Sequence, residues 1–102
     1  MTYPPRNHGI ALEAAAAMTR QFRSKSPAGA KAGAFHADQV RELLEQKGCV
    51  ALRVYNATNE KGEDGFVIVG VDENDQDMTG GVLLEFSYLC PPFCATGSAL
   101  NS

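Results

Sequence analysis

The change of hydrophobic period at Gly48 limits the folds open to this chain more than any other feature. Residues 36–47 carry apolar side chains at helical spacing, and Lys47 and Gly48 are typical of a helix end. Residues 49–56 instead alternate with a period of two. One face of this segment holds Val50, Leu52 and Val54, and the other holds Cys49, Ala51, Arg53 and Tyr55. A helix that passes directly into a half-buried strand predicts a mixed α and β domain.

The rest of the chain adds a second helix and two more strands. Apolar residues recur every four positions over residues 11–23, which predicts a helix there. Residues 24–33 contain Pro27 and two glycines and are predicted to be a connector. The second half is predicted to contain, in order, a polar hairpin tip at 57–65, a central strand at 66–72, an acidic turn at 73–81 and a third strand at 82–89.

Short connections between the strands favour antiparallel pairing, because parallel strands need crossovers of a dozen or more residues. We therefore expect an α+β fold in the order ααβββ, with two helices packed on one face of a three-stranded antiparallel meander. Residues 1–102 are expected to form a single domain. Residues 1–9 are predicted to be an irregular N-terminal arm, and residues 90–102 an irregular C-terminal tail.

Composition excludes several classes of partner. The 102 residues carry a net charge of −3 at pH 7, with a pI near 5.2. Nucleic acids and anionic membranes are bound by clustered Lys and Arg, so neither partner is predicted. No apolar run approaches the roughly 20 residues of a membrane-spanning helix. The alanine-rich stretch at 14–18 has no basic segment before it, unlike a secretion signal. We expect a cytoplasmic protein of bacterial type.

The most unusual local feature is the tail segment Cys90-Pro91-Pro92-Phe93-Cys94. A disulfide between Cys90 and Cys94 can close if the bend brings their Cα atoms within about 4.4–6.8 Å. So short a loop would add only about 2 kcal/mol of stability, which makes switching or shaping its better rationale. The spacing differs from the Cys-x-x-Cys of thioredoxins, and no basic residue adjoins it to activate a thiol.

Zinc ligation is an alternative for the same cysteines. A zinc site needs four ligands, and His36, Cys49, Cys90 and Cys94 could supply a Cys₃His set. The competing interpretation makes Cys49 a small buried side chain and His36 a helix-start residue, and it leaves all three cysteines as free thiols. No cofactor is predicted on balance, with zinc kept as the alternative.

The polar turns and the histidines give no catalytic prediction. Asp72, Asn74 and Asp77 resemble the start of a calcium loop, but the glycine and glutamate that such a loop needs are missing. We expect a solvated turn there. His8 lies in the predicted arm, and no nucleophile elbow accompanies a serine. Arg53 is predicted to form a cross-strand ion pair with Glu85.

Three segments together resemble a known group of proteins. They are residues 48–55 (GCVALRVY), residues 67–72 (VIVGVD) and the CPPFC tail, which is followed by Leu100 and Asn101. The chain is similar to small bacterial proteins of uncharacterised function, chiefly of the Bacteroidetes type, that share a Cys-Pro-Pro-x-Cys tail. The resemblance covers about residues 10–102 and implies this fold and a bacterial origin, but no catalytic residue. Ala11 departs from the group, which tends to carry a capping Ser or Thr there.

Two functional hypotheses follow. The first is a small non-enzymatic binding domain that forms a homo-oligomer or binds a protein partner. It is based on the apolar face predicted for the thin three-stranded sheet, and on the lack of any recognisable group of catalytic residues in the sequence. The second is a thiol-based redox or metal-responsive protein that uses Cys90 and Cys94, with Cys49 as a third member. A small-molecule binder with a pocket between helices and sheet is a further alternative that no sequence feature supports.

Overall fold

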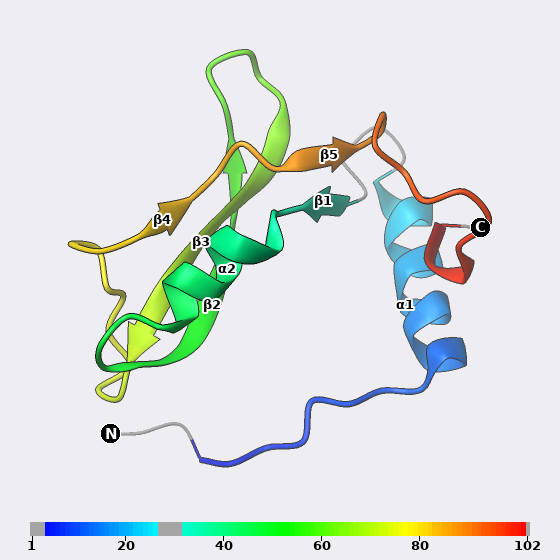
Figure 1. Ribbon diagram of the computed structural model, residues 1–102. Helices are drawn as coiled ribbons and strands as arrows, with labels where there is room; N and C mark the ends of the chain where they lie inside the picture. The colour runs from blue at the N-terminus through cyan, green and yellow to red at the C-terminus, as the bar shows by residue number, and fades with distance from the viewer. Residues whose placement is uncertain (1–3, 27–31, 102) are drawn as a thin grey trace.

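The structure is a computed structural model that describes residues 4–26 and 32–101. It is an α+β arrangement of two α-helices, a three-stranded antiparallel sheet and a two-stranded sheet (Figure 1). Its elements are α1 (Leu12–Lys25), β1 (Ala32–Ala34), α2 (Ala37–Leu44), β2 (Cys49–Thr58), β3 (Asp64–Asp72), β4 (Leu83–Leu84), β5 (Tyr88–Cys90) and the 3-10 turn η1 (Ala99–Asn101).

The larger sheet has the order β2-β3-β4 and is antiparallel throughout, as the short connections predicted. β2 and β3 form a long hairpin that runs from the Ala51↔Val71 pair to the Thr58↔Asp64 pair, with one irregularity at the start of β2. At the predicted tip, the Asn59 side chain accepts hydrogen bonds from the backbone N–H groups of Lys61 (2.9 Å) and Glu63 (3.0 Å). A local side-chain cap of this kind closes the turn without help from the rest of the fold.

One face of this sheet is covered by α2 and holds the core. Leu43 of α2 is fully buried against Ile68 of β3 and Leu84 of β4, with Phe35 and Val40 packed beside them. Leu43 and Val40 belong to the apolar stripe expected from the helical spacing, whereas Leu44, the third member, is 45% exposed. Burial of the first two against the sheet drives the assembly of this layer.

Gln46, directly after α2, ties the helix to the sheet. Its Nε2 donates to the Leu43 carbonyl at 2.8 Å, and its Oε1 accepts from the Val82 N–H at 2.8 Å. The amide therefore satisfies one free carbonyl at the helix end and one N–H just before β4. Gly70 of β3 makes room for it, since a Cβ there would stand 3.0 Å from the Gln46 amide.

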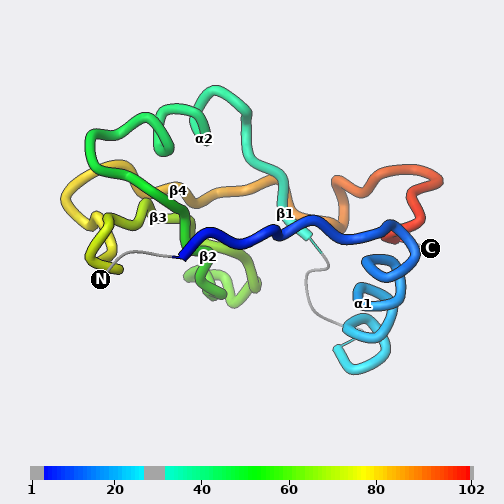
Figure 2. Tube along the Cα trace, turned by 90° about the horizontal axis from the view of Figure 1, so that it is seen from below, coloured from blue at the N-terminus to red at the C-terminus, as the bar shows by residue number. Residues whose placement is uncertain are grey.

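The position of α1 differs from the expected one, in which both helices share a sheet face. α1 contacts the C-terminal turn η1 and lies at one end of the molecule, whereas α2 and the strands β2–β4 lie at the other (Figures 1 and 2). The Arg23 guanidinium donates to the Leu100 carbonyl at 2.7 Å and helps hold this contact. Of the two helices, α2 therefore packs on the core face of the sheet, where Leu52 and Val54 of β2 stay exposed.

The predicted third strand at 82–89 is interrupted. Phe86 has a φ of 58°, a left-handed conformation that no strand accommodates, so the segment divides into β4 and β5. β5 leaves the main sheet and pairs with β1, which lies in the predicted connector. Gly33 of β1 allows this approach, since a Cβ there would stand 2.7 Å from the Ser87 hydroxyl. The observed element order is therefore α1-β1-α2-β2-β3-β4-β5-η1 rather than ααβββ.

Element ends also shift. α2 ends at Leu44 rather than at residue 47, and α1 begins at Leu12 with Ala11 as an N-cap that makes no side-chain hydrogen bond. Residues 4–9 of the predicted arm are exposed and form no helix or strand. Residues 1–3 and residues 27–31 of the predicted connector, including Pro27, lie outside the described residues. No helix in the described ranges is long and apolar enough to cross a membrane.

Candidate functional site

The CPPFC segment forms a closed loop at the end of β5. Cys90 and Cys94 are joined by a disulfide with their Cα atoms 4.8 Å apart, inside the range that the sequence argument required. The Phe93 N–H donates to the Leu89 carbonyl at 2.9 Å across the loop, and both peptide bonds preceding the prolines are cis. Cys90 is buried, whereas Pro91, Pro92 and Phe93 are exposed.

The loop presents two aromatic rings. Tyr88 and Phe93 meet edge to face with ring centroids 5.2 Å apart, and each remains more than half exposed. Beyond the loop the chain returns to α1, where the Leu100 carbonyl accepts from the Arg23 guanidinium at 2.7 Å. The tail is therefore packed against a helix, and the disulfide lies between β5 and that contact.

The structure does not assemble the Cys₃His zinc set. His36 is the N-cap of α2, where its Nδ1 accepts from the Asp38 N–H at 3.3 Å. The Cys49 thiol donates to the Ala51 carbonyl at 3.2 Å and packs beside the core. Cys90 and Cys94 are bonded to each other. Within residues 4–26 and 32–101, no three His, Cys, Asp or Glu side chains are grouped so that they could hold a metal ion.

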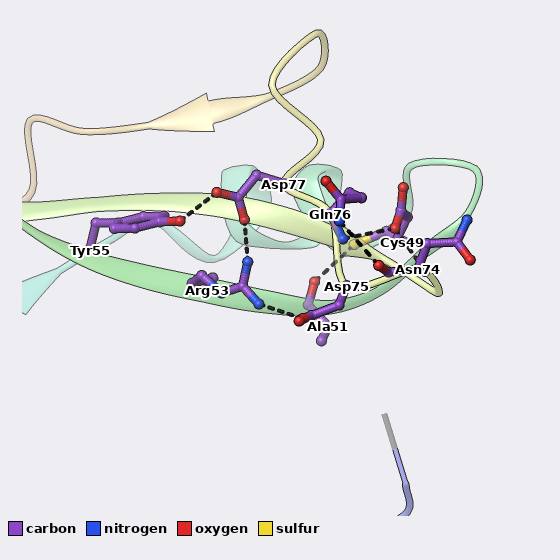
Figure 3. A network of polar contacts seen from close by, with 9 residues as sticks. Cys49, Ala51, Arg53, Tyr55, Asn74, Asp75, Gln76 and Asp77 are labelled. Atoms are coloured by element: carbon purple, nitrogen blue, oxygen red, sulfur yellow. Dashed lines mark hydrogen bonds and ion pairs between the residues drawn. The ribbon is translucent and has the colours of Figure 1, made fainter. Parts of the chain in front are cut away.

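A polar network joins β2 to the acidic turn that follows β3 (Figure 3). The Arg53 guanidinium donates to Asp75 at 2.5 Å and to Asp77 at 2.6 Å, and the Tyr55 hydroxyl donates to the second Asp77 oxygen at 2.5 Å. Glu85, the partner expected from the sequence, is not the residue that Arg53 pairs with here. The sequence predicted that Arg53 pairs with a residue of another strand, whereas its partners belong to the acidic turn that follows β3.

The network lies on the sheet face opposite α2. Arg53 stands across from Val69, while its neighbour Leu52 stands across from Gly70, which packs under Gln46 on the α2 side. Because side chains alternate along a strand, Arg53 and Tyr55 point to the other face. Asp77 pairs beside Val71 of β3 in an antiparallel bridge, so the Arg53–Asp77 ion pair spans β3 on this face. Val69 and Val71 of β3 are 2% and 0% exposed.

The network changes the acidity of Tyr55. Its hydrogen bond to Asp77, together with desolvation and the negative charge of Asp77, raises the pKa of the Tyr55 hydroxyl above its ordinary value of 10.0. A phenol that stays protonated and donates to a carboxylate holds a loop in place, so the network has the chemistry of a clamp rather than of an acid–base pair.

The turn is closed by its own residues, but Asp75 and Asp77 are half-buried rather than fully solvated as predicted. Asp72 Oδ1 accepts from the N–H groups of Asn74 (2.9 Å) and Gln76 (3.0 Å), so this carboxylate caps the backbone. Asp75 takes a φ of 63° at the bend. Asp72 and Asp77 thus have separate structural partners.

A groove of about 720 Å³ lies between α1 and the β2–β3 hairpin, where the sequence offered no signal for a pocket. Met18, Phe22, Phe66 and Leu100 contribute apolar surface to it, and its polar lining includes Asn56, Thr58 and Asp64. Its volume is that of a small-molecule site. A groove of this composition suits an apolar group with a few hydrogen-bonding atoms.

No protein-family model, curated protein or solved structure matches this chain. The resemblance to the Bacteroidetes-type proteins therefore stays a prediction.

Proposed function

We propose that this chain is a non-enzymatic interaction domain that is completed by self-association. The supporting observation is its surface. The chain exposes 7625 Å², about 2,000 Å² more than the roughly 5,600 Å² expected for a compact monomer of this mass. Its radius of gyration is 15.2 Å, against about 12.8 Å for a compact chain of this length.

Several large apolar side chains of the regular elements belong to this surface. Met18 and Phe22 of α1 are 63% and 50% exposed, although the spacing of these residues is that of a core-facing stripe. Leu52 and Val54 of β2 are 38% and 52% exposed on the main sheet. Exposed apolar patches on a small domain mark protein interaction sites. A second copy or another protein would remove it from water.

Sedimentation equilibrium tests this proposal directly. At micromolar concentrations, the measured mass should approach twice the 10.9 kDa of one chain. Non-reducing gel electrophoresis of the same sample shows whether an intermolecular Cys49 disulfide causes the association. A mass of one chain up to about 100 µM overturns the self-association. A dimer that is held together only by a Cys49–Cys49 disulfide, and that a reductant therefore dissociates, also overturns the self-association.

The Cys90–Cys94 disulfide favours a second candidate, a thiol-based redox protein. A dithiol reductant would transfer two electrons and two protons to this bond, yielding two thiols while the reductant itself becomes a disulfide. The bond adjoins the tail that packs on α1, so its opening would free that contact.

Denatured intact mass with thiol titration tests the redox candidate. A mass lower by two hydrogens with one free thiol, that of Cys49, supports it, and peptide mapping locates the bridge. A zinc ion retained in the native protein and lost on denaturation supports the metal-responsive form instead. Three free thiols and no metal contradict both forms.

A further inference from the structure

β2 is an exposed edge strand of unusual length for this molecule. It is ten residues long and, within the described part of the chain, pairs with β3 on one side only, because the sheet order is β2-β3-β4. The opposite edge is formed by β4, which is two residues long. A long edge presents a row of backbone N–H and C=O groups that can pair with another strand, whereas a very short edge does not.

β2 also lacks the features that usually protect such an edge. Its sequence, CVALRVYNAT, contains no proline or lysine, and its one irregularity lies at the start, between Cys49 and Ala51. Protective bulges, prolines and lysines discourage pairing at exposed edges. Residues 51–58 form a regular strand with an open outer side.

The one charge on β2 is compensated within the chain. Arg53 pairs with Asp75 and Asp77 of the acidic turn, and the face that it occupies is opposite α2. On the α2 face of the same strand, Leu52 and Val54 are exposed apolar side chains. A net charge of −3 opposes association of two copies in general, but β2 itself contains no acidic residue. Like charges on two β2 strands would therefore repel only weakly.

We propose that β2 pairs antiparallel with β2 of a second copy, giving one continuous six-stranded sheet with both α2 helices on the same face. This inference rests on the proposed self-association and names its surface. A twofold axis perpendicular to the sheet produces this arrangement, in which each copy uses the same patch. The leucine and valine side chains at positions 52 and 54 then meet their counterparts across the axis.

The available surface is sufficient for such an interface. A stable dimer buries about 800 Å² on each partner. This chain exposes 7625 Å², about 2,000 Å² above expectation for a compact chain. Edge pairing buries the backbone of β2 together with the side chains beside it, so the interface combines hydrogen bonds with apolar contact.

Matched lysine variants test the assignment. Val54→Lys places a charge at the proposed interface, and Leu83→Lys places the same charge on β4, where the replaced side chain is equally exposed (54% against 52%). We expect Val54→Lys to weaken the dimer at least tenfold while Leu83→Lys leaves it intact. Circular dichroism confirms that both variants fold.

Backbone hydrogen exchange of the unmodified protein gives an independent readout. Peptides covering residues 51–58 should become more protected as concentration rises from 1 to 100 µM, whereas peptides covering β4 should not. A Val54→Lys protein that stays dimeric, dissociation of both variants, or concentration-independent exchange in β2 overturns the edge assignment. Wild-type protein that is monomeric at all concentrations overturns the self-association itself, so the two failures are distinguishable.

Discussion

Replacing Gln46 with alanine tests how α2 is attached to the sheet. The change removes two hydrogen bonds of 2.8 Å, one to the Leu43 carbonyl and one from the Val82 N–H. Both bonds are partly buried, and each such bond contributes about 1–1.5 kcal/mol. The free energy of unfolding should therefore fall by about 2–3 kcal/mol, which corresponds to a loss of about 10–20 °C in Tm.

Urea denaturation followed by circular dichroism measures this loss. Wild type and variant must be compared at one protein concentration, because self-association contributes to apparent stability. Gln39→Ala is the matched control, since Gln39 is an exposed residue of α2 and its loss should cost no more than about 0.5 kcal/mol. If Gln46→Ala costs no more than this control, the amide is not the link between helix and sheet.

Three further perturbations follow from the same contacts. Because the pKa of Tyr55 is raised in the folded protein, its contribution to stability is complete below pH 10.0 and is lost as pH rises through the folded-state pKa. Tyr55→Phe should therefore reduce the fall in Tm that wild type shows above pH 10. An equally steep fall of Tm with pH in the variant would refute this role of Tyr55. Arg53→Met should lower the free energy of unfolding measured in urea by about 1.5–2 kcal/mol. The control Arg41→Met, which removes an exposed ion pair, should lower it by less than about 0.5 kcal/mol. Equal losses in the two variants would show that the ion pairs of Arg53 with Asp75 and Asp77 do not stabilise the fold. Gly33→Ala sets a Cβ 2.7 Å from the Ser87 hydroxyl and should destabilise the protein by about 1–3 kcal/mol; a neutral effect in the same assay would contradict the close packing of β1 on β5.

The sequence predicted those elements that periodicity alone specifies. The α2 helix, the β2 and β3 strands and their antiparallel pairing follow from a stripe of apolar residues, a turn glycine and an alternating run. The Asn59 and Asp72 turns are also local, because each is closed by a side chain acting on its own neighbours. Such features need no information from distant parts of the chain.

The errors arose where distant segments decide the structure. β1 is Ala-Gly-Ala, which has no pattern of its own and becomes a strand only because β5 lies beside it. The strand breaks at Phe86 because this residue has a left-handed conformation, which phenylalanine rarely adopts and which the sequence therefore does not indicate. α1 has a core-like stripe, and its contact with η1 depends on where the disulfide loop directs the tail.

The candidate sites show the same division. The spacing of Cys90 and Cys94 allowed a disulfide, a share in a zinc set or free thiols, and it could not decide among them, because closure depends on how the chain bends between the two residues. Arg53 and Tyr55 could have been grouped from their shared face, two residues apart on one strand. Their partners Asp75 and Asp77 could not, because several acidic residues in the turn are equivalent until its fold selects two.

Native mass spectrometry of the unreduced protein tests the central claim of self-association most directly. The account predicts a dominant species of twice the 10.9 kDa chain mass, which dissociates to single chains on denaturation without reductant. A single-chain species that persists as concentration rises would contradict it, and the exposed faces of β2 and α1 would then need another explanation.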